Sequence, residues 1–274
     1  MESTINFNFD GGPAMSNIKG LEWTFNTEAE RYEKMRPGYV PELYDDIFKY
    51  VDINENSNVM EIGIGGGQAT LPVLKKGCKV TAVEYGENLA KVCCEKFKEY
   101  PKFSTVINKF ENSDFESNSF ELIFSASAFH WVSEEIGYSK VFDLLISGGV
   151  FARFANHPFK DKGRKGLHEA IQKVYAIYLP GALGPKEYSE QQALDRANIA
   201  KKYGFVDISY KLYHRTRTFN SDEYVKLLGT YSDHIAIEEK TRNKFFSEIK
   251  SVIDDFGGEI TIYDTIDLQL ARKL

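Results

Sequence analysis

The chain has 274 residues, of which 42% are hydrophobic and 27% charged, as is ordinary for a globular protein. This length suits one open α/β domain, and the net charge of −6 disfavours a nucleic-acid partner, which usually needs a basic face. The sequence has no long apolar run and no secretory signal, so it predicts no membrane span. Its three cysteines, Cys78, Cys93 and Cys94, predict a reduced, cytoplasmic protein, and its histidines lack metal-ligand spacing, so we expect no metal.

The middle of the chain alternates short β-rich runs with helical stretches. Pro41 suits the first turn of a helix that precedes this region. The expected strands are 58–62, 79–84, 103–109, 121–127 and 149–155, and the expected helices are 68–76, 87–100 and 133–146. Strands and helices that alternate in this way predict a parallel sheet covered on both faces.

The last third of the chain departs from this alternation. Two long alternating segments, 206–219 and 259–273, predict late strands with an antiparallel addition at a sheet edge, and a helix is expected at 236–255. Helices are also expected at 164–178 and 187–203, joined by a Pro/Gly loop. We therefore expect one domain with four parts: an N-terminal helical cover (1–50), a cofactor-binding core (51–156), a helical insertion that caps the acceptor (157–203), and C-terminal strands and helices (204–274).

A glycine cluster between the first expected strand and its helix is the strongest motif. In the segment VMEIGIGGGQAT, glycines stand at positions 63, 65 and 67. Glycine permits positive φ in a tight turn, and without a side chain it lets a ligand approach the backbone. The alternative interpretation is a simple tight turn without a ligand.

Glu84 ends the second expected strand, 21 residues after Gly63. An acid at this point can accept two hydrogen bonds from a ribose diol, as in dinucleotide-binding folds. A solvent-facing acid at a strand end is the alternative. The nicotinamide fingerprint GxGxxG/A requires a third small residue, but Gln68 or Thr70 occupies that position, so the spacing favours S-adenosylmethionine over NAD.

With these residues considered together, the chain resembles class I S-adenosylmethionine-dependent methyltransferases, and within them the small-molecule group similar to trans-aconitate methyltransferase. The segments that carry the resemblance are RYEKMRPGYV (31–40), EIGIGGG (61–67), SNSFELIFSASAFHWV (117–132) and LLISGGVF (144–151). Glu121 and Ser147 depart from the family pattern, which has Asp and often Pro there, and Lys109-Phe110 replaces the Asp-Ala of its adenine segment.

The resemblance implies an α/β, Rossmann-like three-layer sandwich with a seven-stranded, mostly parallel sheet whose last strand is antiparallel. It also implies helices within the first fifty residues that cover the cofactor. We expect S-adenosylmethionine to be bound by the following residues: Tyr32, Arg36, Glu61, Gly63, Gly65, Gly67, Glu84, Tyr85, Phe110, Glu111 and Ser125. Among these, Tyr32 could contact the sulfonium through its aromatic face, and Arg36 could bind a carboxylate as a fork.

His130 follows the fourth expected strand, where the resemblance directs the methyl group, and it is the candidate general base. The alternative is a packed histidine that positions Trp131. Phe129, Trp131 and His157 are the expected lining of the substrate pocket. The acceptor is expected to be a small molecule methylated on oxygen or a carboxylate, and the oligomeric state is left open.

Two other functions stay open. A methyltransferase that acts on a macromolecule is disfavoured by the acidic charge and by Ser125-Ala126-Ser127-Ala128, which stands where an Asn-Pro-Pro-Tyr turn would be expected. A non-catalytic module could keep Gly63, Gly65 and Glu84 to bind S-adenosylmethionine or its demethylated product without turnover.

Overall fold

The structure is a computed structural model in which residues 35–182 and 184–274 are described. Tyr32 therefore lies outside the described residues. Among these residues, no helix is both long and apolar enough to cross a membrane. Helix α3 (Pro41–Tyr50) begins with proline in its first turn, as the sequence predicts.

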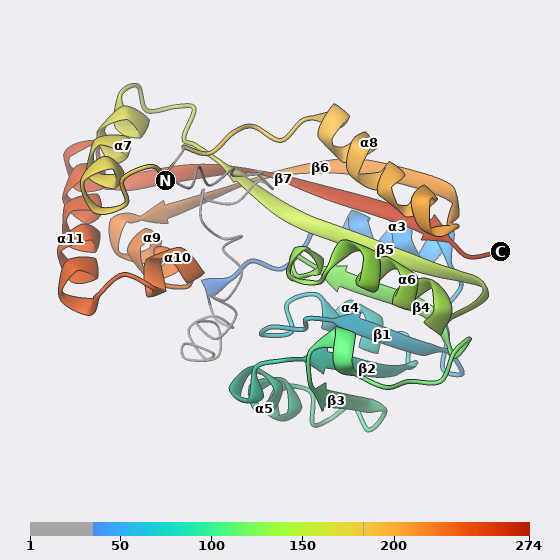
Figure 1. The fold of residues 1–274 in the computed structure, drawn as a ribbon. Helices are drawn as coiled ribbons and strands as arrows, with labels where there is room; N and C mark the ends of the chain where they lie inside the picture. Colours follow the sequence, from blue (N-terminus) through green and yellow to red (C-terminus); the bar gives the residue numbers. More distant parts are fainter. Residues whose placement is uncertain (1–34, 183) are drawn as a thin grey trace, which may run out of the picture. The chain divides into compact units, whose positions relative to one another are not determined.

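Seven strands form one sheet in the order β3-β2-β1-β4-β5-β7-β6 (Figure 1). The strands are β1 (Asn58–Ile62), β2 (Lys79–Glu84), β3 (Phe103–Ile107), β4 (Phe120–Ala126), β5 (Leu145–Phe159), β6 (Val206–Asn220) and β7 (Glu259–Arg272). Strands β1 to β5 pair in parallel, with β1 between β2 and β4. β7, the last strand of the chain, runs opposite to β5 and β6, which confirms the expected fold class (Figure 1).

Helices cover both faces of the β1–β5 region because its strands direct alternate apolar side chains to opposite sides. Val59 points into a core shared with α3, α4 (Thr70–Leu74) and α5 (Glu87–Lys96). Met60, the next residue, points into a second core shared with α6 (Glu134–Leu144) and the short helix η3 (Ile199–Tyr203). Two helical layers on one sheet make the predicted three-layer sandwich.

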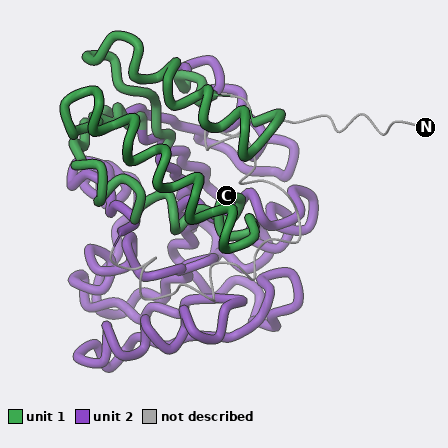
Figure 2. Tube along the Cα trace, turned by 90° about the vertical axis from the view of Figure 1, so that its left-hand side faces the viewer, with its two compact units in different colours: residues 1–21, 157–188, 214–265 green, residues 22–156, 189–213, 266–274 purple. Residues whose placement is uncertain are grey.

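The chain divides into two compact units (Figure 2). Of the described residues, unit 2 contains 35–156, 189–213 and 266–274. Unit 1 contains 157–182, 184–188 and 214–265. Unit 1 holds α7 (Leu167–Tyr178), α9 (Ser221–Leu228), α10 (Ser232–Ile235) and α11 (Glu239–Asp255), whereas α8 (Glu190–Asn198) is in unit 2. The two helices expected in the insertion therefore belong to different units.

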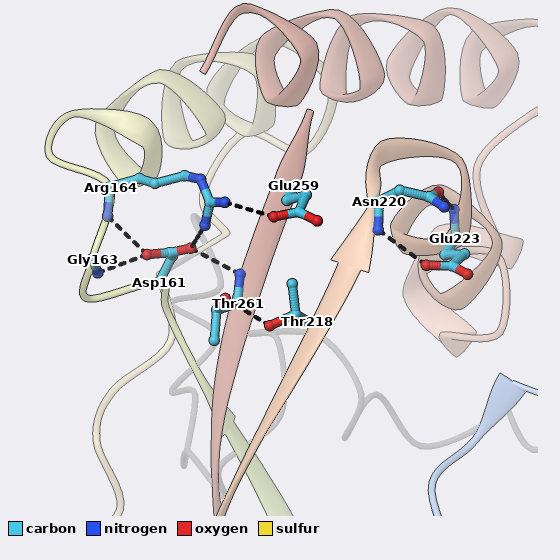
Figure 3. Close-up of polar contacts among 8 residues, drawn as sticks. All are labelled: Asp161, Gly163, Arg164, Thr218, Asn220, Glu223, Glu259 and Thr261. Atoms are coloured by element: carbon cyan, nitrogen blue, oxygen red, sulfur yellow. Dashed lines mark hydrogen bonds and ion pairs between the residues drawn. The ribbon is translucent and has the colours of Figure 1, made fainter. Parts of the chain in front are cut away.

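Two local features differ from the prediction. Helix α6 stops at Leu144 and not at residue 146, and β5 starts at Leu145, before the expected strand 149–155, with an irregular register beside β4 where Gly148 adopts φ +82°. Helix α9 was not predicted, although Asn220 and Glu223 form a reciprocal capping box at its start (Figure 3).

Candidate active site at the carboxyl ends of the first strands

The glycine turn joins β1 to α4 in unit 2 and uses positive φ at three positions. Gly63, Gly65 and Gly67 have φ values of 72°, 55° and 70°. Packing also requires small residues, because an added Cβ would lie 2.5 Å from Cβ of Ala128 at Gly63 and 2.6 Å from the Phe97 ring at Gly67. Glycine is therefore required in this turn for two reasons, the positive φ values and the close packing of neighbouring side chains against the backbone.

Glu84 ends β2 with its carboxylate directed at this turn. Gly65 donates its backbone N–H to Oε2 of Glu84 at 2.9 Å, and Gly86 donates its N–H to Oε1 at 2.8 Å. Glu84 is only 8% exposed; burial raises its pKa, while the backbone N–H groups lower it. The strand-end acid is thus part of the glycine turn and does not face solvent.

A second carboxylate, Glu61, lies fully buried on β1, just before the turn. The Thr70 hydroxyl donates to its Oε2 at 2.6 Å, and Oε1 has no hydrogen-bond partner within the described residues. Burial raises the pKa of Glu61 to about 8; the Thr70 hydrogen bond opposes this rise and the charge of Glu84 adds to it. Burial therefore favours the protonated form of Glu61.

Two side chains of α5 bind the carbonyl side of the glycine turn. The thiol of Cys93 donates to the Gly65 carbonyl at 3.1 Å, and Nζ of Lys96 donates to the Gly66 carbonyl at 2.9 Å. Burial raises the pKa of Cys93, so this thiol stays protonated. These contacts hold the carbonyl groups of the turn, while the Gly65 N–H is bound to Glu84.

The loop after β3 forms the short helix η1 (Phe110–Asn112), where the adenine segment was expected. Phe110 is buried in the core, and Lys140 from α6 donates to the carbonyls of Phe110 at 2.7 Å, Glu111 at 3.3 Å and Ser113. A carboxylate oxygen of Glu111 accepts the Ser133 N–H at 3.3 Å. Sequence reasoning missed Lys140, because nothing in its local pattern marks a lysine that binds a loop.

Tyr85 follows Glu84 directly and exposes half of its side chain. Nζ of Lys109 lies 5.0 Å from the centroid of its ring. Tyr85 thus presents an aromatic surface next to the strand-end acid, in keeping with a cofactor contact.

The end of β4 brings further polar groups beside the turn. Ser125 is fully buried and donates its hydroxyl to the Ile62 carbonyl at 2.8 Å. Ser127 adopts φ +53°, and its Oγ lies 2.8 Å from the Tyr39 hydroxyl. The hydroxyl of Ser125 therefore links β4 to β1 at the end of the two strands. Tyr39 was not singled out as a site residue, although it falls within the segment 31–40 that carries the resemblance.

The short helix η2 (Phe129–Trp131) follows and contains three predicted site residues. Phe129 packs in the core against Tyr138 and Phe151, with ring centroids 5.1 and 4.8 Å away. His130 and Trp131 are partly exposed, with ring centroids 5.1 Å apart. Of the three, His130 and Trp131 keep surface for a ligand.

Two predicted residues remain, Arg36 and His157. Arg36 is half-buried near the start of the described residues. His157 belongs to unit 1, where it is buried and stacks on Tyr188 at 3.7 Å between centroids. Unit 2 therefore brings together Glu61, the three glycines, Glu84, Tyr85, the η1 loop and Ser125.

These residues fit an adenosyl ligand. An ionised carboxylate has about four acceptor positions, and Gly65 and Gly86 use two of those on Glu84, so the carboxylate keeps capacity for a ribose diol. The positive-φ glycines also present backbone without side chains on the same turn.

Comparison with known proteins agrees with this geometry. The sequence profile of a methyltransferase domain matches residues 60–153. An uncharacterised methyltransferase of Schizosaccharomyces pombe is 23% identical, over 84% of this chain and 87% of that protein. A sterol 24-C-methyltransferase of Clavispora lusitaniae is 28% identical, over 59% of this chain and 43% of that protein.

Among solved structures, phosphoethanolamine N-methyltransferase 2 of Haemonchus contortus, in complex with S-adenosyl-L-methionine, has a similar fold. The TM-score is 0.53 at 17% identity, and the match covers 90% of this chain and 57% of that chain. The domain match and the relatives named as methyltransferases indicate that this chain is an S-adenosylmethionine-dependent methyltransferase.

Proposed function

We propose that the chain transfers a methyl group from S-adenosylmethionine to a small-molecule acceptor, on a hydroxyl or carboxylate oxygen. The observation that carries the proposal is the hydrogen bond from Gly65 to Glu84, which joins the glycine turn and the strand-end acid into one preformed site. The net charge of −6 supports a small acceptor over a nucleic acid.

Each part of the site has a role in this proposal. Glu84 would hold the ribose, the glycine turn would face the amino-acid portion, and Tyr85 with the η1 loop would flank the adenine. Bound S-adenosylmethionine supplies an activated methyl group, so the protein has to align the acceptor and exclude water. His130, partly exposed after β4, would accept the proton of a hydroxyl acceptor; a carboxylate acceptor needs no base.

The similar proteins do not identify the acceptor of this chain. Two of the similar proteins are named for different acceptors, a sterol carbon and a phosphoethanolamine nitrogen, and this chain spans only 43% and 57% of their lengths. That residues 157–203 form the acceptor cap, within one methyltransferase domain, is part of the proposal.

The first test is calorimetric titration of the chain with S-adenosylmethionine and with NAD. We expect binding of S-adenosylmethionine, a loss of affinity in Glu84→Ala, and unchanged affinity in Glu87→Gln, whose exposed carboxylate pairs with Lys91. Tight binding of NAD in its place would overturn the cofactor assignment.

A second test separates catalysis from binding alone. Methyl-labelled S-adenosylmethionine is incubated with the chain and a metabolite extract, and labelled products are resolved by chromatography. Label that appears in a small molecule, and is lost in Glu84→Ala, supports the transferase. Cofactor binding without any transfer would favour the non-catalytic module.

A further inference from the structure

Unit 1 contains a small cavity that the proposed transfer does not use. It has a volume of about 80 Å³ and is bounded by α7, α9, α10 and the unit-1 ends of β5 and β7. Most of its wall is apolar, formed by Leu167, Ile171, Leu227, Leu228, Ile260 and Ile262. A cavity of this size suits a compact group, not a nucleoside or a drug-sized ligand, for which about 300 Å³ or more is usual.

Three tyrosines line the same cavity. They are Tyr175 of α7, Tyr224 of α9, and Tyr231, which caps α10. Aromatic faces attract cations through their quadrupole, and the attraction strengthens in a site shielded from water.

Asp233 of α10 adds a buried carboxylate to this wall and is 4% exposed. Its Oδ1 accepts the His234 backbone N–H at 2.9 Å and lies 2.8 Å from Nδ1 of the same histidine. Within the described part of the chain, its Oδ2 has no hydrogen-bond or ion-pair partner. One oxygen of a buried carboxylate is thus left for a ligand that carries positive charge or donates a hydrogen bond.

The carboxylate is held in place from behind. The Tyr175 hydroxyl lies 2.9 Å from Nε2 of His234, and the His234 ring stacks on Phe245 with centroids 5.5 Å apart. The ring of His234, which contacts Asp233, is thus held by Tyr175 and Phe245. This holds the Asp233 carboxylate in position before a ligand binds.

The other charged groups of the wall decide the ligand class. Asp161 is satisfied, because it accepts N–H groups of Gly163, Arg164 and Thr261 and pairs with the Arg164 guanidinium (Figure 3). Lys160 is partly exposed, and its positive charge repels a cation in the cavity. The pKa of His168 is lowered, first by burial and then by the charge of Lys160. Asp233 is therefore the charged group with an unused acceptor, and three tyrosines line the same cavity.

We infer that this cavity binds a compact methylated ammonium group, with Asp233 supplying the countercharge and Tyr175, Tyr224 and Tyr231 supplying aromatic faces. A neutral apolar ligand would leave Oδ2 of Asp233 buried without a partner, which is unfavourable, and an anion would be repelled by the carboxylate. This inference does not depend on the methyl transfer proposed for unit 2.

The test compares choline with 3,3-dimethyl-1-butanol, its uncharged isostere, by calorimetry on the full chain without S-adenosylmethionine. We expect choline to bind at least tenfold more tightly than the isostere. Asp233→Asn should remove that preference, whereas Asp255→Asn, which removes an equal charge from the exposed end of α11, should retain it. Lys160→Gln should tighten choline binding.

Equal binding of the two probes, or binding of neither, would overturn the inference. If Asp233→Asn does not fold by circular dichroism, Tyr224→Leu replaces it: this variant keeps an apolar wall, removes one aromatic face, and should weaken choline severalfold. Calorimetry with S-adenosylmethionine on the same preparation shows separately whether the unit 2 site is intact, so a failure of either proposal is recognised independently.

Discussion

The glycine-turn site of unit 2 and the cavity of unit 1 each contain a buried carboxylate, but they are built differently. Glu84 is held by backbone N–H groups from Gly65 and Gly86, which are local consequences of strand-to-helix turns. Asp233 lines a cavity with side chains of α9, nearby in sequence, and of α7, which is far from it in sequence. A binding site formed by backbone groups of a turn can be recognised from a sequence motif, whereas a site formed by side chains from separate helices cannot.

The largest expected effect tests whether the glycine turn is fixed by packing. Gly63→Ala combines positive φ with a Cβ placed 2.5 Å from that of Ala128, so we expect a loss of about 4 kcal/mol in stability and of cofactor binding. Gly148→Ala is the matched control, because Gly148 also has positive φ but open space around it; its loss should be about 1 kcal/mol. Urea unfolding measures both, and similar losses would show that φ alone matters.

The second prediction concerns Glu61, the carboxylate without backbone donors. The pKa of Glu61 is raised from 4.5, the value expected in the unfolded chain, to about 8 in the folded protein. Between pH 4.5 and pH 8, the unfolded chain therefore loses a proton from Glu61 that the folded protein keeps. Stability should therefore fall by about 3 kcal/mol as pH rises from about 5 to 8, and then level off.

The variant Glu61→Gln should flatten this pH dependence, as followed by urea unfolding at several pH values. Glu116→Gln, which changes an exposed carboxyl, is the control and should leave the slope as it is. A slope that persists in Glu61→Gln would assign the effect to another group.

The third prediction tests the charge of Glu84. Glu84→Gln keeps the shape but turns an N–H donor toward backbone N–H groups and the ribose, so S-adenosylmethionine affinity should fall about 10- to 100-fold, or roughly 1.4–3 kcal/mol. Glu87→Gln should bind as the unaltered chain does, and calorimetry measures both. An unchanged affinity in Glu84→Gln would remove Glu84 from the site.

The smallest effect tests the support of Asp233 in unit 1. Tyr175→Phe deletes a buried hydroxyl that contacts Nε2 of His234, and we expect a loss of about 1 kcal/mol in thermal or urea unfolding. Tyr178→Phe, one turn further along α7, deletes a hydroxyl that bonds to Glu248 in an exposed pair and should have a smaller effect. A reversed order would mean that His234 is not held by Tyr175.

The sequence predicted the fold well where a local pattern carries the information. The strands at 58–62 and 79–84 have their predicted bounds, because apolar runs ended by glycine or acid are unambiguous in a parallel sheet. Helix α9 was missed because it follows the long strand β6 directly, without the glycine or proline break that usually separates elements.

The site was predictable to the same extent. Gly65 and Glu84 are joined by a hydrogen bond, because the carboxyl ends of adjacent parallel strands share one edge of the sheet. The Thr70–Glu61 contact could have been inferred, since Thr70 opens the helix after the turn. The links made by Lys140 and Tyr39 could not, because they depend on tertiary packing that a single sequence does not encode locally.

Strand β7 has a consequence for how the protein is made. It lies between β5 and β6, and its residues complete both units: unit 1 extends to residue 265, and unit 2 resumes at residue 266. Until β7 has been synthesised, the sheet has a gap between β5 and β6, and the edges that these two strands present to β7 are unpaired. Such edges invite wrong pairing, so the sheet is protected only once β7 has been added between them.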